Sequence, residues 1–135
     1  MISFISKVIV LTLCTNILIA NAVTTYDVGI VTQQKIELVS DREARVKAIL
    51  YYYTDKYGIS DQNKLLTEVI RCESRFDRYA IGDGGHSRGL VQIYDDFHPD
   101  ITHEQAFDEE FAVEFLVKNV AEGRGSLWSC YRKLK

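Results

Sequence analysis

A single carboxylate stands at the end of an apolar helical run, just before a bend rich in glycine. Apolar side chains precede Glu73 by seven, four and three residues, at Leu66, Val69 and Ile70. At this spacing they share the helix face that carries the carboxylate. Desolvation there favours the protonated carboxyl, which a general acid needs at neutral pH. The alternative is that Glu73 lies past the helix end and faces water, as charged residues usually do.

The bend after this helix spans residues 77–89 and contains four glycines: Gly82, Gly84, Gly85 and Gly89. Glycine lets the backbone turn sharply and approach a ligand closely. The bend lacks the lysine and the strand–loop–helix context of a phosphate-binding loop. Asp83 is interpreted as a turn former, because a calcium loop needs more acidic ligands. Without rigid helical spacing, three further residues are interpreted as solvated loop residues and not as metal ligands: His98, His103 and Glu104.

Two short motifs flank the bend. Glu73-Ser74 and the later Gly89-Leu90-Val91-Gln92 resemble the Glu-Ser and Gly-Leu-x-Gln motifs of the soluble lytic transglycosylases. Residues 106–112 resemble the stretch that opens the next long helix of that family, and the similarity covers residues 65–119. The resemblance implies a lysozyme-like fold and an enzyme that cleaves the glycan strands of peptidoglycan.

The resemblance also implies a role for each matching residue. Glu73 would protonate the β-1,4 glycosidic oxygen between N-acetylmuramic acid and N-acetylglucosamine. The same carboxylate would then deprotonate the muramoyl 6-hydroxyl, which gives 1,6-anhydro ends without water. Substrate-binding roles are implied for Ser74, Gly89, Leu90 and Gln92. Neither a metal nor a cofactor is expected.

The sequence departs from the family pattern in two places. The third family motif, Ala-Tyr-Asn followed by glycines, is absent from residues 123–128, and Val91 is smaller than the residue usual at its position. One alternative is therefore a hydrolytic muramidase, whose second carboxylate would be Asp83, Asp95 or Asp96. A catalytically inactive peptidoglycan-binding module is another, because fold does not imply function.

The N-terminal residues 1–22 have the pattern of a secretory signal peptide. Lys7 precedes an apolar core at residues 8–20, and residues 20–22 form a small-x-small cleavage site. The core is shorter than the ~20 residues of a membrane span, so we expect cleavage after Ala22. The exported protein would act in the periplasm, in the cell wall or outside the cell, without stable membrane insertion.

The rest of the chain is expected to form one domain behind a short lead-in. Residues 23–39 are interpreted as a flexible lead-in, and residues 40–135 as a mainly α, lysozyme-like α+β domain. We expect four or five helices and a small loop or β-hairpin element at about residues 77–93. The composition is 47% hydrophobic and 26% charged, which is typical of a globular domain. A net charge of −3 does not favour nucleic-acid binding. The resemblance implies the peptidoglycan glycan strand as the partner, and we expect the protein to be a monomer.

Helix ends are also signalled. The capping-box pattern at residues 40–43 predicts a helix start, and residues 102–105 carry another. Asp108 is expected to cap the last long helix, whose apolar side chains predict that it is largely buried. Trp128, the only tryptophan, is either a core side chain or a platform for a sugar ring.

Signal cleavage would leave two cysteines, Cys72 and Cys130. In an exported protein such a pair is either oxidised to a disulfide or remains as two buried thiols. The sequence leaves both open, because it does not give the distance between them. A bridge would tie the C-terminal segment to the helix that carries Glu73 and would stabilise the fold by up to ~4 kcal/mol.

Overall fold

The computed structural model describes residue 38 and residues 40–135. The predicted signal peptide at residues 1–22, and the lead-in at 23–39 apart from residue 38, lie outside the described residues and stay predictions. Asp41–Lys135 is the second of the two units into which the chain divides, and the fold described here is that of this second unit. Among the described residues, no helix combines the length and the apolar character needed to cross a membrane.

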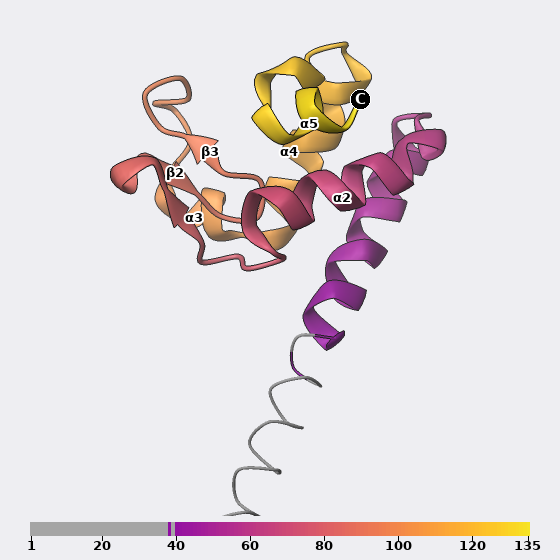
Figure 1. Cartoon of the computed structure of the whole chain (residues 1–135), viewed down its shortest axis with the longest axis horizontal. Helices are drawn as coiled ribbons and strands as arrows, with labels where there is room; N and C mark the ends of the chain where they lie inside the picture. The colour runs from indigo at the N-terminus through magenta and orange to yellow at the C-terminus, as the bar shows by residue number, and fades with distance from the viewer. Residues whose placement is uncertain (1–37, 39) are drawn as a thin grey trace, which may run out of the picture. The chain divides into compact units, whose positions relative to one another are not determined.

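The second unit is mainly helical with a small β element, as predicted (Figure 1). The described part of the chain contains five α-helices, within the four or five expected. A helix at residues 40–56 is followed by η1 (Ser60–Gln62), α2 (Asn63–Ser74), β1 (Ile81–Gly82), η2 (Asp83–Gly85), β2 (Ser87–Arg88), β3 (Ile93–Tyr94), α3 (His103–Phe107), α4 (Glu109–Ala121), η3 (Gly125–Leu127) and α5 (Ser129–Leu134).

Two of the three predicted helix starts are confirmed. The Thr102 side chain and Gln105 form the predicted capping box of α3. The Asp108 carboxylate accepts a hydrogen bond from the backbone N–H of Phe111 and caps α4. The predicted start at Ser40 is wrong, because residue 38 is already helical.

The strands form a three-stranded antiparallel sheet in the order β1-β2-β3, with β1 and β2 in the glycine-rich bend and β3 just after it. Gly89 lies between β2 and β3 with a φ of +77°. A Cβ atom there would come within 1.8 Å of the Ala106 carbonyl oxygen. Only glycine allows this close approach, which packs α3 against the sheet.

The hydrophobic core is built mainly from the helix at 40–56, α2 and α4. α4 is largely buried, as predicted. Glu109, at its first turn, is buried and accepts hydrogen bonds of 2.6 and 2.8 Å from the Arg45 guanidinium, which ties α4 to the first described helix. The largest fully buried apolar side chains are Val46, Leu50, Leu66, Val69, Ile70, Leu90, Val91, Val113, Leu116 and Val117.

Cys72 and Cys130 form a disulfide, which decides between the two alternatives left open by the sequence. Their Cα atoms are 6.0 Å apart, a usual separation for a bridge. The bond joins α2 to α5, which lie side by side (Figure 1). The C-terminal helix is thereby fixed next to the end of α2 that carries Glu73.

Candidate active site

Glu73 faces a small cleft between the end of α2, the sheet and the start of α5. The cleft, here called the Glu73 cleft, has a volume of about 180 Å³. It is lined by Glu73, Asp83, Ser87, Gln92, Tyr94, Phe97, Leu127, Trp128, Ser129 and Arg132. Segments far apart in the sequence therefore meet around one carboxylate.

The position of Glu73 follows from where α2 ends. The helix stops at Ser74, and the next two residues adopt left-handed backbone conformations, with φ of 54° at Arg75 and 62° at Phe76. Phe76 is buried beneath this turn. Glu73 consequently lies in the last turn of α2, where the partial negative charge of the helix C-terminus disfavours a carboxylate.

The carboxyl of Glu73 is half-buried and has one backbone partner. Its Oε1 accepts a hydrogen bond of 3.2 Å from the backbone N–H of Cys130. Burial raises the pKa of Glu73 and outweighs the opposing effects of this hydrogen bond and of Lys133 and Arg132, while Asp83 adds to the rise. The half-buried setting agrees with the first interpretation of Glu73, a carboxyl biased towards its protonated form.

Asp83 is the second carboxylate of the Glu73 cleft. It begins η2 with a φ of 48°, and its Oδ2 accepts a hydrogen bond from the Ser87 hydroxyl. Asp95 and Asp96, the other two candidates for a second carboxylate, do not line this cleft. Only Asp83 of the three therefore shares the cleft with Glu73.

Gln92 lines the Glu73 cleft and is held rigidly by backbone groups. Its φ of 50° is left-handed, and its Nε2 donates to the carbonyls of Gly89 at 2.9 Å and Ala80 at 3.3 Å. Its Oε1 lies against Gly82, where a Cβ atom would come within 2.4 Å of it. The side-chain amide thus braces the cleft wall and keeps its oxygen in a fixed place.

The other three residues with implied substrate-binding roles do not line the Glu73 cleft. Ser74 is buried, and its hydroxyl donates to the Ile70 carbonyl at 3.2 Å. Leu90 is fully buried in the core, and Gly89 packs against α3. The structure thus gives these three residues packing contacts, and their implied substrate-binding roles stay predictions.

An aromatic groove continues from the Glu73 cleft. It has a volume of about 380 Å³ and shares Gln92, Tyr94, Phe97, Leu127 and Trp128 with the cleft. Its other lining residues are Ile93, His98 and Phe115. The cleft and the groove together form an extended depression with the carboxylates at one end.

Trp128 and Phe97 give this groove two different kinds of aromatic surface. Trp128 is a core side chain, 6% exposed, whose Nε1 donates to the Val91 carbonyl at 2.7 Å. Its accessible edge still lines the groove. Phe97 is 79% exposed, so the groove offers an apolar face that is open to a ligand.

Sequence reasoning missed most of the residues contributed by the C-terminal segment. Leu127, Ser129 and Arg132 were not candidates, and the backbone N–H of Cys130 carries no sequence signature. The signal that could have found them is the cysteine pair. A bridge to Cys72 places residues near Cys130 beside Glu73.

One group of side chains could hold a metal ion. Among the described residues, His86, Asp95 and Asp96 place ligand atoms within 4.8 Å of one another. Asp95 is already paired with Arg88 and, at 3.0 Å, with His86 Nδ1. This exposed cluster is satisfied by its own ion pairs and lies outside the Glu73 cleft.

The chain was compared with protein-family models, curated proteins and solved structures, and none of them matches it. The lysozyme-like assignment and the transglycosylase family therefore remain expectations that rest on the motif residues. A functional conclusion has to be drawn from the geometry around Glu73.

Proposed function

We propose that the protein is a peptidoglycan lytic transglycosylase in which Glu73 acts as general acid and then as general base. The observation that carries the proposal is the half-buried Glu73 carboxyl, with its raised pKa, at the end of an aromatic groove. An extended groove suits a chain-like ligand better than a compact one. Its apolar rings suit the faces of sugar rings.

The hydrogen bonding of Glu73 suggests which oxygen carries the proton. Oε1 accepts from the Cys130 N–H, so the proton belongs on Oε2. Oε2 donates it to the glycosidic oxygen as the bond to the anomeric carbon breaks. The resulting carboxylate is stabilised by the Cys130 N–H and by the nearby charges of Arg132 and Lys133.

The second half of the reaction returns Glu73 to its starting state. The carboxylate removes the proton from the muramoyl 6-hydroxyl, and that oxygen bonds to the anomeric carbon. The products are a free 4-hydroxyl on one sugar and a 1,6-anhydro end on the other. One carboxylate completes this cycle, and no water is consumed.

Asp83 supports a second candidate reaction, which is hydrolysis of the same glycosidic bond. An inverting glycosidase needs a second carboxylate that directs water to the opposite face of the sugar. Asp83 lines the same cleft, and its field reaches Glu73. Hydrolysis by a muramidase is therefore the second candidate function, and it predicts reducing ends in place of anhydro ends.

The test is mass spectrometry of the fragments released from purified peptidoglycan. We expect products lighter by one water molecule than hydrolysis products. Glu73→Gln should lower the rate by about 10²–10⁴-fold, the usual contribution of a general acid or base. Glu68→Gln is the matched control, because Glu68 is an exposed carboxylate on the same helix.

The other possible outcomes either support a different function or refute the proposal. Reducing ends that disappear in Asp83→Asn would replace the transglycosylase with the muramidase. Binding to peptidoglycan without any cleavage, unchanged by Glu73→Gln, would mean an inactive binding module. If the protein neither binds nor cleaves peptidoglycan, the proposal is refuted.

A further inference from the structure

A second and larger pocket lies against α5, and it shares Arg132 with the Glu73 cleft. This α5 pocket has a volume of about 580 Å³, within the range of ~300–1,000 Å³ typical of ligand sites. Its lining residues are Ile59, Gln62, Val120, Gly123, Gly125, Ser126, Tyr131, Arg132 and Lys135. The proposed reaction leaves this pocket without a role.

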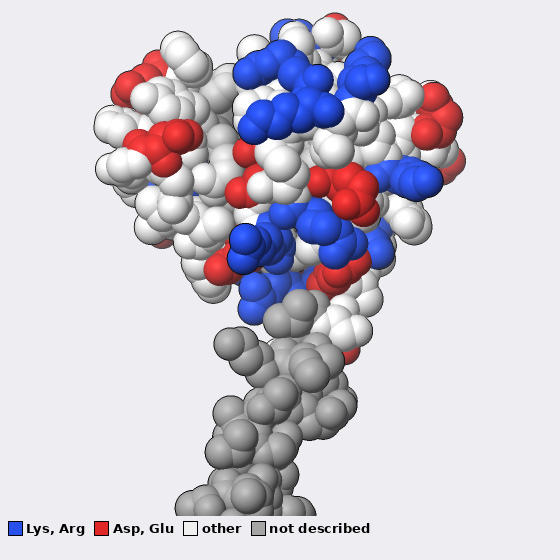
Figure 2. Space-filling view, in the orientation of Figure 1, with Lys and Arg blue, Asp and Glu red and all other residues white. Residues whose placement is uncertain are grey.

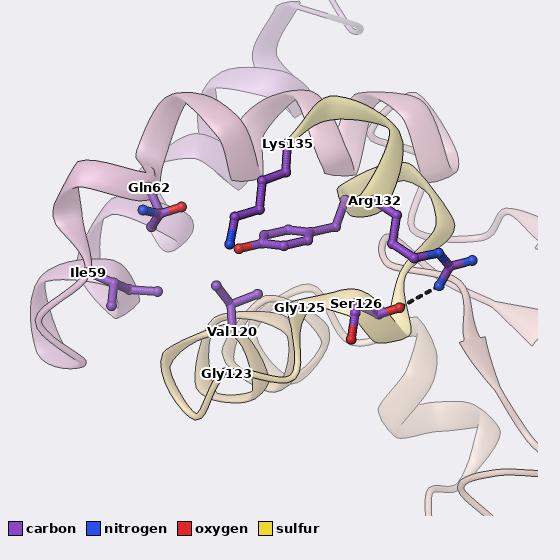
Figure 3. A pocket seen from close by; sticks show the side chains of 9 residues that line it. Ile59, Gln62, Val120, Gly123, Gly125, Ser126, Arg132 and Lys135 are labelled. Carbon is purple, nitrogen blue, oxygen red and sulfur yellow. Dashed lines mark hydrogen bonds between the residues drawn. The ribbon is translucent and has the colours of Figure 1, made fainter.

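The lining of the α5 pocket is cationic and apolar (Figure 3). The Lys135 side chain points into it, with Nζ 5.5 Å from the centre of the Tyr131 ring. Arg132 lies at the other end, where it donates a hydrogen bond to the Ser126 carbonyl and keeps further N–H donors for a ligand. None of the nine described lining residues is acidic.

The pocket belongs to a basic surface on a chain that is acidic overall. Arg132, Lys133 and Lys135 are all exposed, and among the described residues none of them forms an ion pair. Figure 2 shows lysine and arginine side chains gathered over the region of α5. The formal net charge of the chain is −3, so this local excess of positive charge needs a specific explanation.

The floor of the pocket is built by close packing. A Cβ atom on Gly125 would lie 2.6 Å from the Tyr131 ring, so the ring rests directly on the backbone of η3. The disulfide from Cys130 to Cys72 holds the same turn of α5 against α2. Arg132 is therefore presented from a fixed helix, and Lys135 follows directly at the C-terminal end of that helix.

We propose that the α5 pocket binds the peptide attached to N-acetylmuramic acid, through the carboxylates of that peptide. This inference rests on the proposed function, which places muramic acid in the Glu73 cleft. Arg132 borders both sites, so a peptide leaving the sugar would pass this side chain and reach Lys135. Small apolar side chains of the peptide would meet Val120 and Ile59, while its carboxylates would meet the cations.

The test compares two soluble glycan fragments of equal length, one carrying its peptides and one stripped of them by an amidase. At low salt we expect the protein to cleave the peptide-bearing fragment about threefold to tenfold more efficiently, as expected for one or two exposed ion pairs. Lys135→Glu should remove most of this preference without changing cleavage of the stripped fragment. Lys118→Glu is the matched control, because Lys118 is exposed and lines neither site.

A second measurement does not depend on cleavage. The free peptide is added to the protein, and the backbone amide signals of Gly123 and Ser126 are followed by NMR. We expect these signals to shift in the wild type and in Lys118→Glu, and to stay in place in Lys135→Glu.

The outcomes separate the two proposals. Equal cleavage of both fragments by the wild type would overturn the peptide site and leave the proposed function standing. Amide shifts without cleavage of either fragment would overturn the proposed enzyme and support the peptide site. If neither cleavage nor amide shifts are observed, both the proposed function and the peptide site are overturned.

Discussion

Removing the disulfide between α2 and α5 is expected to lower both the stability of the protein and the pKa of Glu73. The bond closes a loop with a sequence separation of 58 residues. In the chain-entropy model such a loop stabilises the fold by up to ~4 kcal/mol. The compact unit Asp41–Lys135 has 95 residues, for which a typical total stability is ~5–14 kcal/mol. The bridge is therefore a large share of the total.

The effect on Glu73 follows from what covers it. Burial is the largest cause of the raised pKa, and the start of α5 supplies part of that burial together with the Cys130 N–H. If α5 loosens, water reaches the carboxyl and its pKa falls towards the ordinary value. Because the acid must be protonated to act, the alkaline limb of the pH–activity profile should move to lower pH.

The assay is thermal unfolding with and without a reducing agent, followed by a pH–activity profile on peptidoglycan. For a domain of this size, a loss of ~4 kcal/mol lowers Tm by roughly 15–30 °C. The double variant Cys72→Ser/Cys130→Ser should match the reduced wild type and should not respond to the reducing agent. If the reduced wild type melts within a few degrees of the oxidised protein and keeps its alkaline limb, packing alone holds α5 and the reasoning is wrong.

Three further predictions follow from the same contacts. The pKa of Glu73 is higher in the folded state than in the unfolded state, so the ionised Glu73 carboxylate opposes folding. The stability that comes from the protonated carboxyl is therefore lost as pH rises through the folded-state pKa. Glu73→Gln should therefore raise Tm at pH 7, and the gain should vanish at a pH below the ordinary carboxyl pKa. The charge of Lys133 lowers the pKa of Glu73, so Lys133→Gln should move the alkaline limb of the pH–activity profile to higher pH. The charge of Asp83 raises this pKa, so Asp83→Asn should move the limb to lower pH. Identical limbs in the two variants would contradict this account. Gly89→Ala should lower the free energy of unfolding by at least about 3 kcal/mol in denaturant titrations, because the new Cβ atom would overlap a backbone carbonyl of α3. Gly84→Ala should lower it by only about 1 kcal/mol, because a Cβ atom there meets open space and only the φ of +67° is unfavourable.

Local patterns in the sequence predicted the elements of the fold well. Helical periodicity located α2, and the side chains of Thr102 and Asp108 marked the starts of α3 and α4. These signals work because caps and amphipathic faces depend on residues close in sequence. The same logic failed at Ser40, where a capping-box pattern lies inside a helix that is already formed at residue 38. A local signal cannot exclude a longer helix.

The candidate site was predicted only where the chain itself brings residues together. Glu73 and Gln92 lie on either side of one glycine-rich bend, and both line the cleft. Ser74 and Leu90 carry motif identities but face the interior, a direction that depends on how α2 and the sheet pack. The contribution of residues 127–132 depends on the docking of α5, which is a long-range contact that no local pattern encodes.

The position of α5 also bears on the missing third motif. That motif contains a tyrosine, but here the Tyr131 ring of α5 packs on Gly125 and lines the α5 pocket. The polar partner of Glu73 is instead the backbone N–H of Cys130. Any residue other than proline has this backbone donor, so the type of residue at position 130 does not matter for the hydrogen bond. The N–H must, however, be held in a fixed position beside Glu73. The disulfide at the same residue provides that constraint, which explains how a chain without the motif still holds a hydrogen-bond donor against its candidate acid.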